Sequence, residues 1–292
     1  MKSLLCFCLV FLLGATARAG LTPDVEYGRA DGVSLRLNAY VPDGDGPFPA
    51  VILVHGGGWN SGDKAGGAKR ALISPMEDPL AHAGFAWFSI NYRLAPQHPY
   101  PAAIEDVETA IRWVRAHAAE YHIDLRRLAI AGESAGGHLV ALAAVRADAS
   151  TQVAAVVVFY GRFDMLADAR IQGGKLSGNL AQFVASDHLD ERTTAVLRAA
   201  SSLDKVHAGL PPFLLLHGTK DDHVPYHQSV DMRAKLRSVG VACDLITVPD
   251  GPHGMIYWDK FLPSYKDQVV AWLERTLPAP GAVISVSDAL RR

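Results

Sequence analysis

The stretch LAIAGESAGGHLVAL, residues 128–142, decides the fold of this 292-residue chain. Its first four residues are apolar and suit a buried strand, and the residues after Gly137 are apolar and rich in alanine, as in a buried helix. Between them, the pattern Gly132-x-Ser134-x-Gly136 places a serine at a sharp strand-to-helix turn, where glycines prevent crowding. Such a turn lifts the hydroxyl clear of the sheet, beside a helix N-terminus that favours developing negative charge. A glycine-rich turn with a chance serine is the alternative, and the flanking strand and helix argue against it.

Short apolar runs elsewhere predict a parallel sheet covered by helices, because strands apolar on both faces are typical of such sheets. After Pro101, apolar residues recur at spacings of three and four over residues 104–118 and predict a crossover helix. Residues 34–41 alternate instead, and with the Asp31-Gly32 turn signal they predict an N-terminal antiparallel hairpin. We therefore expect an α/β fold with a mostly parallel central sheet and helices on both faces. The apolar runs are residues 51–54, 86–90, 128–131, 153–160, 213–216 and 245–248.

The first nineteen residues are predicted to be a cleavable signal peptide. Lys2 precedes an apolar run over residues 4–13, and Ala17-Arg18-Ala19 gives the small-x-small pattern of a cleavage site. The run is shorter than the roughly twenty apolar residues that span a bilayer. We expect a secreted or periplasmic protein with no membrane anchor after cleavage; an uncleaved anchor is the alternative.

The rest of the chain is predicted to form one catalytic domain over residues 20–277. Residues 161–208 interrupt the alternation of strands and helices, and such an excursion is expected to lie over the ends of the sheet as a lid-like insertion. Residues 278–292 contain proline and glycine with a basic end, and are expected to be a loosely ordered tail.

Charge and cysteine content argue against several classes of function. The net charge is −2 without any run of like charges, so neither nucleic acid nor an anionic membrane is an expected partner. Only Cys243 follows the predicted signal peptide, which excludes an internal disulfide in the mature chain. Its apolar surroundings predict a buried side chain rather than a reactive thiol.

The segment HGGGW, residues 55–59, directly follows an apolar run. Three consecutive glycines let the backbone approach a substrate closely with its N–H groups directed inward. The N–H groups of Gly57 and Gly58, with that of Ala135 after the serine, are therefore the candidate oxyanion hole. His55 is expected to order the loop rather than to exchange protons. A merely flexible glycine loop is the weaker alternative at this position.

Two segments late in the chain offer an acid and a base, namely HGTKDDHVP, residues 217–225, and Pro252-His253-Gly254. A serine is a weak nucleophile unless a base takes its proton, and the base needs a third group to fix its tautomer. His253 stands in a loop after the last apolar run and is the candidate base for Ser134. Spacing alone leaves Asp221 and Asp222 open as the acid.

These aspartates and the nearby histidines are also weighed as a metal site. His217, His223 and His227 could cluster with Asp221 and Asp222, but no pair among them has a recognised zinc-site spacing. We expect neither a metal ion nor an organic cofactor.

Taken together, these motifs resemble the esterase/lipase branch of the α/β-hydrolase superfamily, particularly its bacterial-type feruloyl and acetyl esterases. The resemblance implies hydrolysis of a carboxylic ester through an acyl-enzyme on Ser134. In the family's H-G-x-x-D-x-x-V-P pattern the acid is the fifth residue, which implies Asp221 when counted from His217. Arg93 and Asp106 look structural. The motifs that carry the resemblance are HGGGW (55–59), SGDK (61–64), NYRLAP (91–96), YPAA (100–103) and GESAGG (132–137).

The expected substrate is a small-molecule or polysaccharide-linked ester, with short acyl esters and the acetyl or feruloyl esters of plant polysaccharide as the leading hypotheses. An amidase resembling arylformamidases and an exopeptidase resembling the prolyl oligopeptidase group are the enzymatic alternatives. A non-catalytic binding protein on the same scaffold is less expected, because Ser134, Asp221 and His253 are all retained.

Overall fold

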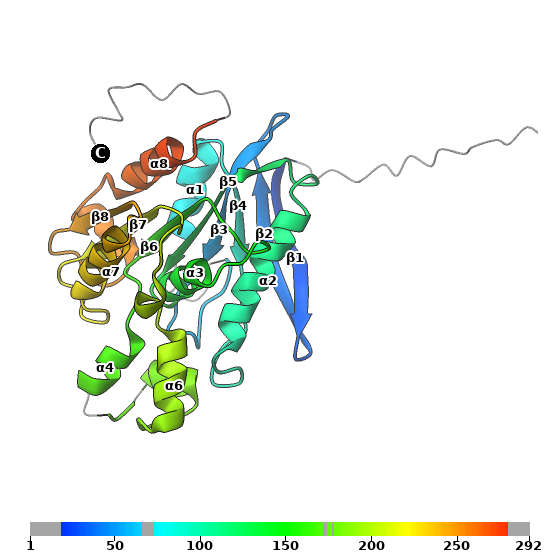
Figure 1. Ribbon diagram of the computed structural model, residues 1–292. Helices are drawn as coiled ribbons and strands as arrows, with labels where there is room; N and C mark the ends of the chain where they lie inside the picture. Colours follow the sequence, from blue (N-terminus) through cyan, green and yellow to red (C-terminus); the bar gives the residue numbers. More distant parts are fainter. Residues whose placement is uncertain (1–18, 66–72, 172–173, 177, 280–292) are drawn as a thin grey trace, which may run out of the picture.

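The computed structural model describes residues 19–65, 73–171, 174–176 and 178–279. Most of the predicted signal peptide and of the predicted tail lie outside these residues. The described residues form one eight-stranded sheet in the order β1-β2-β4-β3-β5-β6-β7-β8 (Figure 1). The strands are β1 (Gly20–Ala30), β2 (Val33–Val41), β3 (Phe48–Val54), β4 (Ala86–Ile90), β5 (Ile123–Glu133), β6 (Ala155–Phe159), β7 (Phe213–Gly218) and β8 (Cys243–Val248).

The first two strands form the predicted antiparallel hairpin. Asp31 and Gly32 both have positive φ, 47° and 77°, as a tight two-residue hairpin turn requires. β2 also pairs antiparallel with β4, whereas every other pairing in the sheet is parallel. The predicted fold class, an α/β-hydrolase sheet with an N-terminal antiparallel hairpin, is confirmed.

Helices cover both faces of the sheet, which explains why its central strands are apolar throughout. In β3, Ile52 belongs to the apolar cluster that includes side chains of α2, α3 and α7, and the adjacent Leu53 belongs to the cluster on the opposite face that includes side chains of α1 and α8. Cys243 is buried at the edge of this core, and burial raises the pKa of its thiol to about 12. The helices are α1 (Glu77–His82), α2 (Ala102–Ala116), α3 (Ala135–Val145), α4 (Met165–Ile171), α5 (Gly178–Val184), α6 (Glu191–Ala200), α7 (His227–Ser238) and α8 (Tyr265–Thr276), with short 3₁₀ turns η1 (Ser74–Met76), η2 (Leu203–Lys205) and η3 (Met255–Lys260).

The predicted crossover helix is α2, and its apolar stripe is buried against the sheet. Beside its N-terminus, the buried Arg93 donates to Asp106 from Nε and Nη2, at 2.9 and 2.8 Å, and also contacts Asp31 of the hairpin turn. This ion pair ties the loop after β4 to α2 and to the hairpin, the structural role expected for Arg93 and Asp106.

The helices α4, α5 and α6 lie between β6 and β7 in the chain and extend away from the sheet (Figure 1). The excursion begins and ends at one point, because the backbone N–H groups of Ser202 and Leu203 both donate to the carbonyl of Phe163, at 3.0 and 3.1 Å. Gln228 of α7 holds the same point by accepting from the N–H groups of Phe163 and Asp164. Within the described ranges, no helix combines the length and the apolar character needed to cross a membrane.

Candidate active site

Ser134 occupies the turn between β5 and α3 in a strained backbone conformation, with φ 52° and ψ −115°. The flanking glycines make this turn possible. A Cβ on Gly132 would lie 2.4 Å from the carbonyl oxygen of Gly136, and a Cβ on Gly136 would lie 2.2 Å from that of Val54. The turn packs its backbone directly against the end of β3, so side chains larger than hydrogen cannot be accommodated there.

The structure brings Ser134, His253 and Asp221 together, although they lie on three different loops. His253 Nε2 lies 3.0 Å from Ser134 Oγ, and His253 Nδ1 lies 2.7 Å from Asp221 Oδ2. Because the carboxylate accepts the Nδ1 proton, Nε2 of the neutral ring is free to accept the serine proton. Ser134, Asp221 and His253 follow the carboxyl ends of the parallel strands β5, β7 and β8, respectively. Open α/β sheets commonly form their binding sites at this edge.

The side chain of Asp221 is fully buried, and its second oxygen is also bound. Oδ1 accepts from the backbone N–H groups of His223 and Val224, at 2.9 and 2.8 Å. Burial acts to raise the pKa of Asp221, but hydrogen bonds from His217 and His253 and the Val224 N–H together hold that pKa below its usual range. The carboxylate is therefore ionised and fixed in orientation.

The alternative acid, Asp222, points elsewhere. Its side chain is 77% exposed and Oδ1 accepts from Nδ1 of His223 at 2.6 Å. The geometry thus separates the two aspartates that spacing left open, with Asp221 beneath His253 and Asp222 at the surface.

Of the other two histidines weighed for a metal site, His217 contacts Asp221, with Nε2 3.3 Å from Oδ2, and His227 contacts neither Asp221 nor Asp222. His217 is buried, donates from Nε2 to the carbonyl of Val224 and accepts at Nδ1 from Ser229. His227 pairs with Asp231 on α7. In the described part of the chain, Asp221, Asp222 and His223 are the group whose side-chain atoms lie close enough together to hold a metal ion. Both carboxylates of this group bind histidines, Asp221 binding His253 and Asp222 binding His223.

The glycine loop after β3 has the conformation that its sequence predicts. Gly57 and Gly58 have positive φ, 93° and 62°. A Cβ on Gly57 would lie 2.2 Å from the backbone oxygen of Ser61, and a Cβ on Gly58 would lie 1.9 Å from Nδ2 of Asn179 on α5. His55 orders the loop, since it is buried, donates from Nδ1 to the Gly56 carbonyl and stacks on Tyr92. Burial lowers the pKa of His55 to about 4, so its ring is neutral.

Glu133, inside the serine motif, links this loop to the loop of His253. Its buried carboxylate accepts the N–H of Gly56 at 2.5 Å and contacts the hydroxyl of Tyr160. Tyr160 accepts from the N–H of Met255 and meets the His253 ring edge-on, with centroids 4.6 Å apart. Sequence reasoning missed Glu133 and Tyr160, because their role depends on contacts between distant segments.

Helix α5 reaches the same loop. Asn60 donates from Nδ2 to Oδ1 of Asn179 and to Oε1 of Gln182, at 2.9 and 2.8 Å, and Phe183 stacks on Trp59 with centroids 4.5 Å apart. The excursion between β6 and β7 therefore forms part of the wall of the site.

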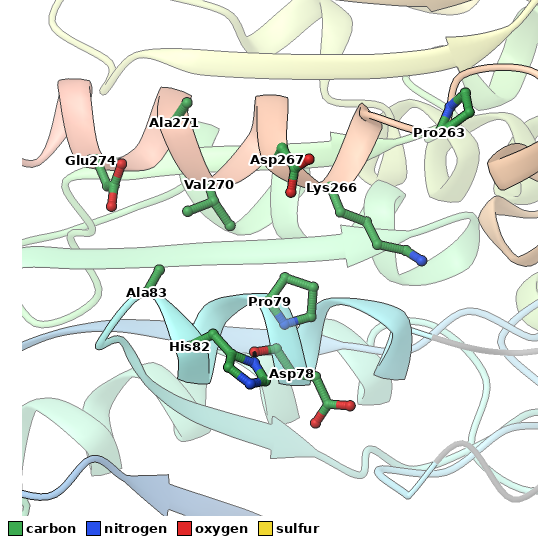
Figure 2. Close-up of a pocket in the computed structure, with 10 residues that line it drawn as sticks. All are labelled: Asp78, Pro79, His82, Ala83, Pro263, Lys266, Asp267, Val270, Ala271 and Glu274. Carbon is green, nitrogen blue, oxygen red and sulfur yellow. Dashed lines mark hydrogen bonds between the residues drawn. The ribbon is translucent and has the colours of Figure 1, made fainter.

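A cavity of about 760 Å³ opens above Ser134, and the predicted oxyanion donors Gly57, Gly58 and Ala135 all line it together with His253. This volume lies within the usual range of roughly 300–1,000 Å³ for small-molecule sites. A second cavity of about 530 Å³ lies between α1 and α8, where Asp78 and His82 face Lys266 and Asp267 (Figure 2). None of the residues that line it belongs to the serine motif or the glycine loop, so the first cavity is the candidate site.

Comparison with known proteins agrees with this fold. The BD-FAE family model matches residues 37–236. Esterase LipC of Mycobacterium tuberculosis is 35% identical over 71% of this chain and 53% of its own length, and carboxylesterase NlhH of the same organism is 31% identical over 80% and 75%. Among solved structures, a truncated carbohydrate esterase from gut microbiota superposes with a TM-score of 0.76 at 26% identity, covering 91% of this chain and 100% of that one. Thermogutta terrifontis esterase 2 phosphorylated by paraoxon gives 0.69 at 26%, covering 88% and 92%.

The fold, the site and these relatives define the class, which is the esterase branch of the α/β-hydrolase superfamily, as the motifs predict. Within that class, the chain belongs to the BD-FAE family. It spans about half the length of LipC, LipM and LipQ.

Proposed function

We propose that the protein is a serine carboxylic-ester hydrolase that works through an acyl-enzyme on Ser134. The observation that carries the proposal is the continuous hydrogen-bonded line from Ser134 Oγ through His253 to the buried Asp221, with distances of 3.0 and 2.7 Å. This arrangement can remove the hydroxyl proton as the oxygen attacks a carbonyl carbon.

In the proposed reaction, Ser134 Oγ bonds to the ester carbonyl carbon while His253 Nε2 takes its proton. The carbonyl oxygen becomes an oxyanion, which the N–H groups of Gly57, Gly58 and Ala135 stabilise. The tetrahedral adduct then expels the alkoxide, which His253 protonates, and leaves the acyl group on Ser134. Water, deprotonated by His253, hydrolyses this acyl-enzyme to the carboxylic acid and restores the serine.

For the substrate, we propose acetyl or feruloyl esters of plant polysaccharide, reached by the export that the N-terminal pattern predicts. Supporting this, the cavity lining combines the half-exposed Tyr257 with the polar residues Asn60, Asn179 and Arg162. An aromatic face beside hydrogen-bonding groups suits either an aromatic acyl group or a sugar ring. A structural relative is named a carbohydrate esterase.

The test compares acetyl, butyryl and feruloyl esters with a formamide and a peptide anilide on the mature protein, with Ser134→Ala as control. Ester turnover that disappears in Ser134→Ala supports the proposal. Exclusive cleavage of the formamide or the anilide would overturn the ester assignment in favour of an amidase or peptidase. Stoichiometric labelling by an organophosphonate is expected in the wild type and not in Ser134→Ala; an unreactive wild type would indicate a non-catalytic scaffold.

A further inference from the structure

Two consecutive aspartates in the loop after β7 each hold one histidine, and the two histidine rings stack on one another. Asp221 binds His253 at 2.7 Å, and Asp222 binds His223 at 2.6 Å. The rings of His223 and His253 are 4.8 Å apart between centroids and inclined by only 16°. The site therefore consists of two parallel Asp–His pairs, of which the proposed reaction uses only the inner one.

The outer pair lies between the inner pair and solvent. The side chains of Asp221 and His253 are 0% and 17% exposed, whereas those of Asp222 and His223 are 77% and 69% exposed. A side chain this exposed is usually mobile. At His223, however, hydrogen bonds hold both the backbone N–H and the backbone carbonyl. Its N–H donates to Asp221 Oδ1 at 2.9 Å, and its carbonyl accepts from Arg162 Nη2 at 2.9 Å.

The His253 ring is contacted at both nitrogens, at one edge and on one face, and the contact on the face comes from the outer pair. Asp221 and Ser134 bind its two nitrogens, and Tyr160 meets it edge-on from the end of β6. His223 covers a face of the ring. Charged groups next to His223 are Asp221, Asp222 and Arg162, and the hydrogen bond from His223 lowers the pKa of Asp222, which keeps that carboxylate ionised.

We propose that His223, held by Asp222, is a positioning residue that keeps the His253 ring in the plane between Asp221 and Ser134 and shields it from water. This inference rests on the proposed function. A ring confined between Asp221 and Ser134 spends less time in rotamers that cannot reach the serine, so the stacked His223 raises the rate of proton transfer without binding substrate more tightly. Its exposed Asp222 partner adds a negative charge beside the imidazolium that forms in the transition state.

The test uses His223→Ala, which removes the ring, and His223→Phe, which keeps a stacking face and removes the hydrogen bond to Asp222. The chain offers a matched control in His188→Ala, because His188 pairs with the preceding Asp187 at 2.9 Å on an equally exposed surface away from His253. We expect His223→Ala to lower kcat on a nitrophenyl acetate about 3- to 10-fold, the scale of one aromatic pair, with KM changed less than about twofold. His223→Phe is expected to recover most of that loss, and His188→Ala to match the wild type.

Two further readouts separate positioning from a general structural effect. The rate at which an organophosphonate inactivates Ser134 is expected to fall in parallel with kcat in His223→Ala. The acidic limb of kcat/KM is expected to move to lower pH in Asp222→Asn, because a negative charge beside the stacked rings is lost. Wild-type kcat in His223→Ala, equal losses in the Ala and Phe variants, or an acidic limb that moves to higher pH in Asp222→Asn would each overturn the inference. A wild type without turnover or labelling would instead be a failure of the proposed function.

Discussion

Trp59 donates its indole N–H to Nδ1 of His138 across 3.1 Å and so joins the glycine loop to the helix that follows Ser134. His138 is fully buried and donates from Nε2 to the carbonyl of Ala200 at the end of α6, at 2.7 Å. Burial lowers the pKa of His138 to about 4, so the ring is neutral with its proton on Nε2. One imidazole thus connects both motifs of the site to the excursion between β6 and β7.

His138→Phe is expected to destabilise the fold by about 2–4 kcal/mol, because it leaves the Trp59 N–H and the Ala200 carbonyl buried without partners. Urea unfolding of the wild type and the variant measures this. Trp59→Phe removes the indole donor and keeps the His138 ring, and the double variant is expected to cost less than the sum of the two single variants. Additive losses would show that the two rings are not energetically coupled.

Asp221→Asn is expected to lower kcat about 10³- to 10⁴-fold, because an amide in place of the carboxylate no longer fixes the tautomer of His253. Asp222→Asn, one residue along the chain, is expected to change kcat less than about tenfold, since its carboxylate binds only the outer histidine. Steady-state kinetics on one nitrophenyl ester compares the two directly. A larger loss in Asp222→Asn would reverse the assignment of the acid.

Gly57→Ala and Gly58→Ala are both expected to lower activity, but for different reasons. Only Gly58→Ala is expected to regain activity when Asn179 is also replaced by alanine. The new methyl group would meet the backbone of Ser61 at Gly57 but the Asn179 side chain at Gly58. Adding Asn179→Ala to Gly58→Ala removes the two closest atoms that the methyl group would meet, although Asn179 Cβ at 3.0 Å and the positive φ of Gly58 remain. This addition is therefore expected to restore part of kcat, while the same addition to Gly57→Ala restores none. Losing one oxyanion donor raises the barrier by about 2.7–4 kcal/mol, which sets the expected scale for Gly57→Ala. Equal rescue at both positions would contradict this geometry.

We expect Glu77, at the start of α1, to make the free energy of unfolding depend on pH. Burial and then the charge of Asp78 raise its pKa from 4.5 to about 7, so between these values the folded state holds a proton that the unfolded state has lost. Below pH 4.5 Glu77 is uncharged in both states and its burial costs nothing for charge. The free energy of unfolding then falls as the pH rises from 4.5 through 7, because the carboxyl must ionise while it is partly buried. Because Gln stays uncharged, Glu77→Gln is expected to be more stable than the wild type above pH 7, by about 1–2 kcal/mol after allowing for partial exposure, and equal to it below pH 4.5.

Thermal unfolding at several pH values tests this, with Glu274→Gln on the exposed face of α8 as the control. A Tm difference between Glu77→Gln and the wild type that does not change with pH would contradict the expected linkage.

Local sequence patterns predict most of the fold and the centre of the site. The spacing after Pro101 anticipates α2, the alternation over residues 34–41 anticipates β2, and the serine motif in its strand-to-helix context anticipates the turn at Ser134. Asp221 and Asp222 are adjacent and have the same neighbours in the sequence. Which of them is the acid therefore depends on the position of His253, which follows a different strand. The contacts of α5 with the glycine loop join segments about 120 residues apart, and no short-range pattern records them.

The shared carbonyl of Phe163 has a consequence for how this protein family can diversify. Since residues 164–201 leave and return at one acceptor, we expect that a segment of another length could replace them without moving β6 relative to β7, provided that it supplies an acceptor for His138 in place of the Ala200 carbonyl. Ser134, His253 and Asp221 all lie outside it, whereas Asn179 and Leu180, which help to line the cavity, lie inside it. Chimaeras that exchange residues 164–201 between relatives are expected to keep the catalytic residues of one parent and to take part of the cavity wall from the other.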